Sequence, residues 1–208
     1  MYKHFFKRVI DFLTAFFGLV VLLPFFLPLC IALYFINGGS PFFTQSRPGL
    51  NEKVFKLIKL KSMNDKKDAE GNLLPDEVRL TKTGNFLRKT SLDEIPQLLN
   101  VIKGDMSLVG PRPLRVHYLP YYTEREATRH TVRPGITGLA QVSGRNSVDW
   151  DEKLELDAQY IDQLSFAFDF KILLKTFVKI FKSSEVILDD TNMVTFDEHR
   201  KRQNEATK

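Results

Sequence analysis

The stretch FLTAFFGLVVLLPFFLPLCIALYFI (residues 12–36) decides the architecture, because it contains no charged side chain. As one continuous helix it would be roughly 37 Å long, and the apolar core of a bilayer is about 30 Å thick. The stretch is longer than the apolar region of a secretory signal peptide, and it has no clear A-x-A cleavage site. We therefore expect a helix that is embedded in a membrane.

Two prolines and the flanking charges indicate how this helix lies in the membrane. Pro24 and Pro28 each remove a backbone donor, so the helix should kink or break near them. Basic residues flank the stretch on both sides, namely Lys3, Lys7 and Arg8 before it and Arg47, Lys53, Lys56, Lys59 and Lys61 after it. Since basic flanks favour the cytoplasmic side, a re-entrant helix would satisfy both ends. The alternative is an ordinary spanning helix with a proline kink.

The overall composition of the 208 residues excludes several classes of protein. The net charge of +5 is spread along the chain and forms no basic block, so no nucleic-acid partner is expected. A single cysteine, Cys30, excludes a disulfide scaffold and a cysteine-based zinc site. Hydrophobic residues make up 43% of the chain, which is too many for a disordered protein. The sequence contains no P-loop, dinucleotide-binding or nucleophile-elbow motif.

After the apolar stretch, the patterns predict an α+β fold that is mostly helical, with short β-hairpins. Residues 54–60 give a weak strand signal, residues 62–82 are expected to form a mobile surface loop, and the Gly-rich residues 131–146 predict a short hairpin. Helices are predicted at residues 91–103, 149–164 and 169–182. The residues after Asp189 are polar and are expected to fray.

The predicted helix at residues 169–182 is amphipathic and basic. Its lysines recur at spacings of four, four and three residues, and phenylalanine, leucine and valine fill the other faces; the lysines are Lys171, Lys175, Lys179 and Lys182. Such a helix suits the headgroup interface of a membrane. The alternative is a core helix with a solvated lysine face. The tyrosines Tyr118, Tyr121 and Tyr122 are also candidates for that interface.

The adjacent carboxylates Asp93 and Glu94 are the first candidates for chemistry. Ser91 and Glu94 have the spacing of a capping box, so a plain helix start also explains the pair. Pro96 argues against that explanation, because it would be the fifth residue of a helix capped at Ser91. In either case the carboxylates lie beside a helix N-terminus, which favours phosphates. An ionised carboxylate can attack phosphorus, and its neighbour can hold Mg²⁺.

Several arginines are candidates for binding phosphate oxygens, because the planar guanidinium group matches their geometry. Arg88 closely precedes the carboxylate pair, and Arg112 lies between two prolines that would hold its backbone rigid. Arg133 and Arg145 flank the Gly-rich stretch. For each of them a surface salt bridge is the alternative.

Four stretches together resemble the bacterial sugar transferases, which are monotopic phosphoglycosyl transferases. They are TQSRPGLN (44–51), SLDEIPQLLNVIKGDMSLVGPRP (91–113), VRPGITGLAQVSGRN (132–146) and LSFAFDFKILLKT (164–176). The resemblance runs from the apolar stretch to about Lys182, in family order. It implies transfer of a sugar-1-phosphate from a UDP-sugar to undecaprenyl phosphate or another polyprenol phosphate, with release of UMP.

The resemblance also implies roles for individual residues. Asp93 would attack the sugar-bearing phosphate and form a covalent intermediate, and Glu94 would help to hold Mg²⁺, with Mn²⁺ as an alternative. The family's functional basic positions fall on Arg47, Lys59 and Arg112, and its later acidic positions on Asp157 and Asp169. Asp169 is equally explained as a helix N-cap. Arg88 and Arg145 are additional candidates for phosphate contacts.

The membrane helix of the family is re-entrant and broken at a Ser-Pro pair, and that site reads Leu23-Pro24 here. The expected organisation is a re-entrant membrane segment (1–40), a catalytic domain on the cytoplasmic face of the bacterial inner membrane (41–188) and a polar tail (189–208). Membrane lipids and downstream glycosyltransferases are the further partners that the resemblance implies. An N-acetylated or deoxyamino UDP-sugar is the expected donor, with UDP-glucose or UDP-galactose as the alternative.

Two other functions compete with the transferase. A membrane-anchored adaptor without activity would explain the apolar stretch and the basic helix, with Asp93–Glu94 as a helix cap. It would leave Arg112 between its two prolines unexplained. A membrane phosphohydrolase would use the same carboxylate and metal but would release sugar-1-phosphate to water.

Overall fold

The structure is a computed structural model and describes residues 1–144, 149–181 and 194–206. Its α-helices are α1 (Lys7–Ile36), α2 (Asp76–Arg79), α3 (Lys82–Lys89), α4 (Gln97–Lys103), α5 (Glu124–Ala127), α6 (Leu139–Ser143), α7 (Trp150–Gln163), α8 (Phe166–Phe181) and α9 (Phe196–Ala206). Its strands are β1 (Phe42–Pro48), β2 (Val54–Leu60), β3 (Ser107–Val109) and β4 (Gly135–Thr137). A short π-helical segment, η1 (Tyr2–Phe6), precedes α1. Short 3₁₀ segments lie between the other elements, namely η2 (Leu50–Glu52), η3 (Leu92–Glu94), η4 (Val116–Tyr121) and η5 (Thr128–Thr131). The fold is therefore mostly helical with small sheets, as predicted.

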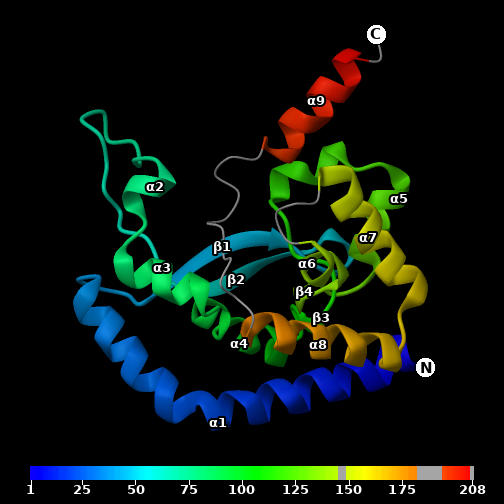
Figure 1. Cartoon of the computed structure of the whole chain (residues 1–208), viewed down its shortest axis with the longest axis horizontal. Coiled ribbons are helices and arrows are strands. Elements are labelled where there is room, and N and C mark those ends of the chain that lie inside the picture. The colour runs from blue at the N-terminus through cyan, green and yellow to red at the C-terminus, as the bar shows by residue number, and fades with distance from the viewer. Residues whose placement is uncertain (145–148, 182–193, 207–208) are drawn as a thin grey trace.

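The apolar stretch folds into one continuous helix, α1, which is long and apolar enough to cross a membrane. The helix passes through both Pro24 and Pro28, and its axis turns in the half that contains them (Figure 1). A proline inside a helix removes one hydrogen bond and crowds the preceding turn, which accounts for the bend. The predicted break at Leu23-Pro24 is thus a bend in a continuous helix, and a re-entrant path through a membrane stays a prediction.

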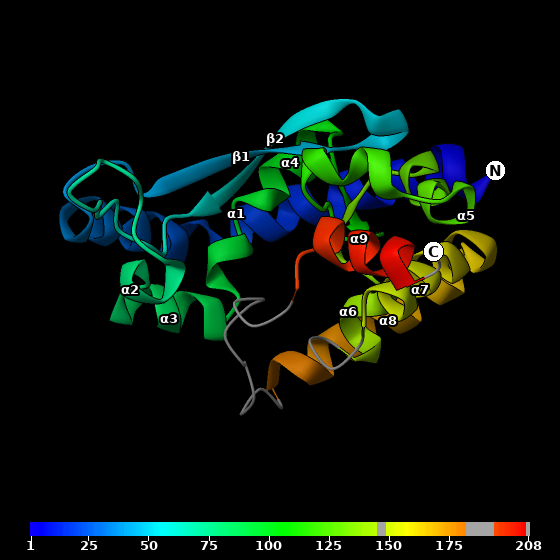
Figure 2. The same ribbon diagram turned by 90° about the horizontal axis from the view of Figure 1, so that it is seen from above.

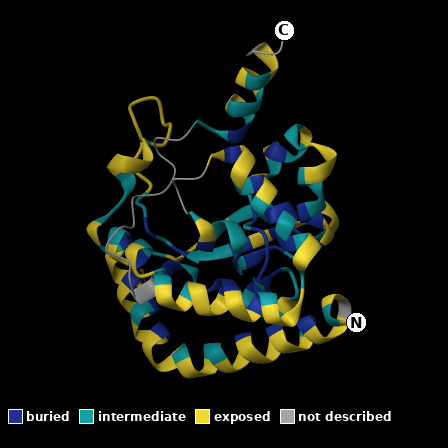
Figure 3. Ribbon diagram, turned by 45° about the vertical axis from the view of Figure 1, so that its right-hand side comes forward, coloured by how far each residue is buried: buried dark blue, intermediate teal, exposed yellow. Residues whose placement is uncertain are grey.

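α1 and α8 form the lower side of the molecule in Figure 1, and much of both helices is exposed (Figure 3). Many of the exposed large hydrophobic residues lie on these two helices. On α1, Phe25 and Phe35 are 78% and 75% exposed, and on α8, Phe170 and Phe177 are 53% and 61% exposed. α8 buries only a narrow stripe around Ile172 in the part whose side chains are described. A core helix with only lysines in solvent would not leave these rings outside, so α8 matches an interfacial helix better.

Buried polar contacts hold the start of α1 against the body. Lys7 Nζ lies 2.6 Å from Asp169 Oδ2, and Asp11 accepts a hydrogen bond from the Ser107 hydroxyl at 2.7 Å. Arg8 donates to the carbonyls of Val101 and Ile102, where α4 ends. These carbonyls carry the negative end of the α4 dipole, so the guanidinium group suits them. α1 is therefore fixed to the body at its N-terminal end.

The strand predicted at residues 54–60 is β2, and it pairs with β1 in an antiparallel hairpin whose register joins Phe42 to Leu60 and Pro48 to Val54. Figure 2 shows the hairpin reaching from the α2–α3 end of the molecule towards α5. Its inner face packs on α1, where Leu60 and Leu33 share a core cluster, and on α4. The hairpin thus covers α1 and α4, and side chains of β2 reach the residues that follow α3.

Several sequence predictions are corrected by the structure. In the described part of this stretch, residues 131–144, no hairpin forms, because β4 pairs in parallel with β3 and α6 follows it. Residues 62–82 contain α2 and the isolated bridges Met63–Leu80 and Lys67–Leu73. The third helix begins at Phe166 rather than Asp169, so Asp169 is not its N-cap. Parallel pairing depends on partners distant in sequence, which local patterns do not report, whereas the start of α8 has a local partner, because the Phe168 amide donates to the Ser165 hydroxyl at 3.3 Å.

The C-terminal residues also differ from the prediction. Residues 196–206 form the helix α9, and Phe196 is fully buried against Tyr118 and Trp150. Tyr118 is therefore a core residue of this cluster and does not lie at a membrane interface. In Figure 1 α9 extends from the side of the molecule opposite to α1.

Candidate active site

The carboxylates Asp93 and Glu94 lie on a tight turn between α3 and α4. α3 begins at its N-cap Thr81, whose hydroxyl accepts a hydrogen bond from the Gly84 amide at 2.9 Å. After α3 ends, Ser91 takes a left-handed conformation with φ of 56°, and the single turn η3 carries both carboxylates. Such a conformation is uncommon for a residue with a side chain, so this turn stores backbone strain.

The helix predicted over residues 91–103 is therefore confirmed only from Gln97 to Lys103, and the predicted capping box is wrong. Ser91 makes no capping hydrogen bond, and α4 begins at Gln97 with Pro96 as the residue before it. Proline suits the start of a helix because its missing N–H would have no partner there. The proline that argued against a helix capped at Ser91 is thus where the chain restarts its helix.

Lys59, which lies on β2, reaches both carboxylates from the hairpin. Lys59 Nζ lies 3.1 Å from Glu94 Oε1 and 3.6 Å from Asp93 Oδ2. Since side chains alternate along a strand, Lys59 points to one side while its neighbour Leu60 enters the core. One ammonium group therefore serves both carboxylates.

Arg112 completes the cluster from a different part of the chain. Its Nη1 lies 3.2 Å from the same Glu94 Oε1 that receives Lys59. The flanking Pro111 and Pro113 are both buried, so the backbone at this position is held on either side. The Arg112 side chain is 40% exposed and the Lys59 side chain 23%, so both cations face solvent in part.

The two carboxylates differ in their electrostatics. Burial raises the pKa of Asp93, and the adjacent Glu94 charge adds to this, while Lys59 opposes it. Burial would also raise the pKa of Glu94, but Lys59 and Arg112 outweigh it and lower that pKa to about 2. Glu94 is therefore a fixed anion, whereas Asp93 is the more basic carboxylate of the pair. A pair whose pKa values are pushed apart suits two different tasks.

Arg88 and Arg47 lie at different distances from this cluster. Arg88 Nε donates to the Ser62 hydroxyl at 3.1 Å, and its charge acts on Asp93 to lower the pKa of that carboxyl. Arg47 is paired with Phe55 in the hairpin, whereas Lys59 is paired with Phe43, so the two positions are roughly 13 Å apart along the strands. Arg47 Nη2 donates to Gln45 Oε1 at 2.6 Å. The structure thus places Arg88 beside the dyad and Arg47 nearer the tip of the hairpin.

The remaining predicted residues lie elsewhere. Arg145 falls outside the described residues. Asp157 is buried with Arg129 at 2.9 Å, and burial raises the pKa of Asp157 to about 6 against the opposing charge of Arg129. Asp169 accepts hydrogen bonds from Lys7, Tyr2 and Tyr160. Both carboxylates have cations of the chain itself as partners, and their contact with a substrate stays a prediction.

A metal at this site would have two carboxylates of the chain available. In residues 1–144, 149–181 and 194–206 no group of three or more metal-binding side chains comes together. Two carboxylates nevertheless fit Mg²⁺, which usually takes one or two from a protein and completes its shell with water and substrate phosphates.

Sequence reasoning missed the support behind Arg112. Arg129 Nη2 donates to the Arg112 carbonyl at 2.6 Å, and Arg129 Nη1 donates to the Tyr122 hydroxyl at 3.2 Å. No local motif marks Arg129, because its partners lie seven to 28 residues away in the chain. The signal is visible only once the fold brings η4, η5 and α7 together.

Comparisons with known proteins agree with the motifs. The model of the bacterial sugar transferase family matches residues 2–183. The uncharacterized sugar transferase EpsL of Bacillus subtilis is 54% identical over 190 residues, which cover 91% of this chain and 93% of that protein. The galactosyl transferase CpsE of Streptococcus agalactiae is 41% identical, over 82% of this chain and 41% of its own length.

A third relative carries a more specific name. The UDP-glucose:undecaprenyl-phosphate glucose-1-phosphate transferase of Escherichia coli is 40% identical, over 84% of this chain and 40% of its own length. The chain thus spans nearly all of the Bacillus subtilis relative and about two-fifths of the two longer ones.

Proposed function

The chain belongs to the bacterial sugar transferase family, as its four motifs predict, and from this premise we propose that it transfers a sugar-1-phosphate from a UDP-sugar to undecaprenyl phosphate. The products are a polyprenyl diphosphate sugar and UMP, and the reaction is the first membrane step in the assembly of a glycoconjugate. The name of the Escherichia coli relative supports this class of reaction. Downstream glycosyltransferases would extend the product.

The observation that carries the proposal is the half-open cluster around Asp93. Its carboxylate is buried at the base of the site, while Lys59 and Arg112 stand beside it with their cations partly in solvent. Cations that are already sealed against carboxylates would have no access to a phosphate. Here an incoming diphosphate can meet an ammonium, a guanidinium and a nucleophilic carboxylate in one place.

The proposed reaction has two steps. In the first, a carboxylate oxygen of Asp93 bonds to the sugar-bearing phosphorus, and the bond from that phosphorus to the bridging oxygen breaks. UMP leaves with the electron pair, and an aspartyl phosphosugar remains. In the second, an oxygen of undecaprenyl phosphate attacks the same phosphorus and the Asp93 carboxylate is released. The raised pKa of Asp93 supports this role, because a more basic carboxylate is a better nucleophile.

The neighbours of Asp93 supply charge and orientation. Lys59 and Arg112 would neutralise phosphate oxygens while Glu94 holds the two cations in place. Mg²⁺ is the proposed cofactor, with Mn²⁺ as the alternative, and Asp93 and Glu94 would hold it. When bound, the metal would neutralise charge on the donor diphosphate.

We place the catalytic domain on the cytoplasmic face of the bacterial inner membrane, where the nucleotide sugar is soluble and the lipid phosphate is in reach. The exposed apolar surfaces of α1 and α8 support membrane contact, with α1 in the leaflet and α8 at its surface. Holding both substrates at one interface removes the need to extract the lipid, and proximity lowers the barrier.

The experiment that tests this function is an assay of UMP release. The full chain in detergent with Mg²⁺ and undecaprenyl phosphate is offered a panel of UDP-sugars that includes N-acetylated, deoxyamino, glucose and galactose donors. We expect UMP from one preferred donor, and a covalent phosphosugar adduct on Asp93 when the lipid is withheld. Asp93→Asn should abolish both signals, and Glu77→Gln, an exposed carboxylate on α2, is the matched control.

Other outcomes would contradict the proposal in distinct ways. Release of sugar-1-phosphate to water at the same rate with and without lipid would identify a phosphohydrolase. A folded protein that releases no UMP from any nucleotide sugar, and whose Asp93→Asn variant behaves like the wild type, would identify an adaptor.

A further inference from the structure

α9 follows the residues that the family model matches, yet it is docked closely on the catalytic domain. Phe196 at its start is fully buried, and its ring lies 5.2 Å from that of Tyr122 in a stacked arrangement. The rings of Tyr118 and Trp150 lie 5.5 Å and 5.4 Å from it. Such aromatic contacts are directional as well as apolar, so Phe196 fixes the position of the Tyr122 ring.

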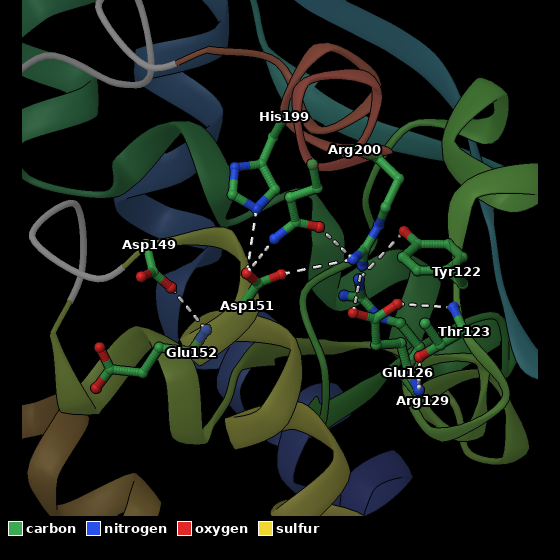
Figure 4. Close-up of polar contacts among 10 residues, drawn as sticks. Tyr122, Thr123, Glu126, Arg129, Asp149, Asp151, Glu152, His199 and Arg200 are labelled. Carbon is green, nitrogen blue, oxygen red and sulfur yellow. Dashed lines mark hydrogen bonds and ion pairs between the residues drawn. The ribbon is translucent and has the colours of Figure 1, made fainter. Parts of the chain in front are cut away.

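Polar side chains in the next turn of α9 also contact the catalytic domain (Figure 4). Arg200 Nη2 donates to Glu126 Oε1 at 2.5 Å, and Arg200 Nη1 lies 3.7 Å from Asp151. His199 Nε2 lies 3.3 Å from Asp151 as well. The side chains of Arg200 and Glu126 are 15% and 12% exposed, so this ion pair is largely shielded from solvent. α9 is therefore held by a buried ring and by charge, on elements that surround Tyr122.

A continuous chain of contacts leads from Tyr122 to the active site. The Tyr122 hydroxyl accepts a hydrogen bond from Arg129, whose guanidinium carbon lies 5.4 Å above the Tyr122 ring. Arg129 donates to the backbone carbonyl of Arg112 at 2.6 Å. The side chain of Arg112 then reaches Glu94 at 3.2 Å. Each link is a direct contact, and the last one is with the carboxylate beside Asp93.

We propose that α9 is a positioning element for the reaction, with Phe196 setting Arg112 through Tyr122 and Arg129. The inference rests on the proposed function, because it assigns Arg112 to the binding of donor phosphates. Arg112 emerges from a backbone held between two prolines, so its guanidinium follows the position of its own carbonyl. A small displacement of such a group is costly, since misplacement by about 1 Å can lower a rate by about a hundredfold.

The first test compares two residues of the same helix. Phe196→Ala removes the buried ring, and Lys201→Ala removes an exposed side chain of α9. We expect Phe196→Ala to lower kcat/KM for the UDP-sugar by about tenfold, mainly through KM, because Arg112 would lose its alignment with the donor phosphates. Phe196→Leu should restore most of the loss, and Lys201→Ala should match the wild type. An unchanged kcat/KM in Phe196→Ala would overturn the proposal.

A second variant keeps the proposal testable if Phe196→Ala fails to fold. Tyr122→Phe keeps the ring that Phe196 touches and removes only the hydroxyl that Arg129 meets. It should show the same rise in KM with little change in thermal stability. A Tyr122→Phe protein with wild-type KM would show that the contact chain carries no alignment.

Double variants separate positioning from general stability. In an Arg112→Ala background, Phe196→Ala and Tyr122→Phe should each cause no further loss of kcat/KM, since they act through the side chain that is already absent. If both variants lowered kcat/KM by the same factor in the Arg112→Ala protein as in the wild type, α9 would have a merely structural role and the inference would be overturned.

Hydrogen exchange distinguishes failure of this inference from failure of the proposed function. In the full chain, the backbone around Arg112 should exchange faster in Phe196→Ala than in Lys201→Ala, whether or not any donor is turned over. Equal exchange in the two variants would overturn the positioning role. Absence of UMP release by the wild type, together with the expected exchange difference, would count against the proposed reaction and leave the contact chain supported.

Discussion

Two kinds of buried carboxylate pair occur in this molecule, and they differ in the exposure of their cations. In Lys7–Asp169 and Arg129–Asp157 every side chain is at most 9% exposed. In the candidate active site, Asp93 and Glu94 are also mostly buried, but the Arg112 side chain is 40% exposed. We call a cation sealed when it is buried in its ion pair and has almost no access to solvent. We call it half-open when it is partly exposed, so that it can also contact an anion from solution. Exposure of the cation, rather than burial of the acid, is therefore the feature that separates the candidate site from the two structural ion pairs.

The comparison gives the two groups opposite expected phenotypes. Loss of one partner of the Lys7–Asp169 pair should destabilise the protein and leave the chemistry of the folded fraction intact. Loss of a half-open residue should do the reverse, because its partners can still reach solvent.

The largest effect is expected at Asp93. Asp93→Asn removes the nucleophile and should lower kcat for UMP release by a factor of at least about 10³. Thermal stability should stay the same or rise, since a buried carboxylate with a raised pKa becomes a neutral amide. The assay and a thermal melt in the same detergent give both numbers. Residual turnover within tenfold of the wild type would place the nucleophile elsewhere.

The sealed pair Lys7–Asp169 should give the opposite result. Asp169→Ala leaves Lys7 buried without its carboxylate and should destabilise the protein by about 3–5 kcal/mol. The double variant Lys7→Met with Asp169→Leu removes both charges and should recover most of that loss. Denaturant unfolding in detergent measures these changes, and kcat per folded molecule should stay close to that of the wild type. A stable Asp169→Ala protein with a large loss in kcat would instead support the predicted contact with substrate.

The sequence could predict the elements whose signals are local. The helix predicted at residues 149–164 is α7 (Trp150–Gln163), which Asp149 caps by accepting a hydrogen bond from the Glu152 amide at 2.8 Å, and β2 has the predicted bounds. The parallel pairing of β3 with β4 could not be predicted, since no local pattern marks two three-residue strands. The resemblance to the family located Asp93, Glu94, Lys59 and Arg112, which the structure brings together.

The same resemblance grouped Asp157 and Asp169 with the dyad, and sequence alone could not separate them. The partner of Asp169 is Lys7, which lies 162 residues earlier in the chain. The partner of Asp157 is Arg129, on a short turn with no motif of its own. Whether a carboxylate is sealed or half-open depends on such distant cations, and only the fold reveals them.

An intermediate effect is expected from pH, and it sharpens the comparison within the active site. The pKa of Glu94 is lowered to about 2 in the folded chain, below the ordinary glutamate value of 4.5. Its ionisation therefore contributes stability that is fully present above pH 4.5 and is lost as the pH falls towards 2. Thermal melts of the wild type should fall more steeply over this window than those of Glu94→Gln. Parallel curves for the two proteins would show that Lys59 and Arg112 do not hold the charge of Glu94.

The smallest effect is expected at Ser91, where the turn itself is tested without removing any charge. Its φ of 56° lies in the left-handed region, which glycine adopts freely and a β-branched residue resists. Ser91→Gly should therefore change the free energy of unfolding by less than about 0.5 kcal/mol, because relief of strain is offset by the greater freedom of the unfolded chain. Ser91→Val should cost about 1–2 kcal/mol and should also lower kcat, since the turn that carries Asp93 must shift to accommodate it. Equal stability and equal kcat for the two variants would mean that the left-handed turn does not set the position of the dyad. The strain at Ser91 would then be incidental, and the half-open cluster would owe its geometry to Lys59 and Arg112 alone.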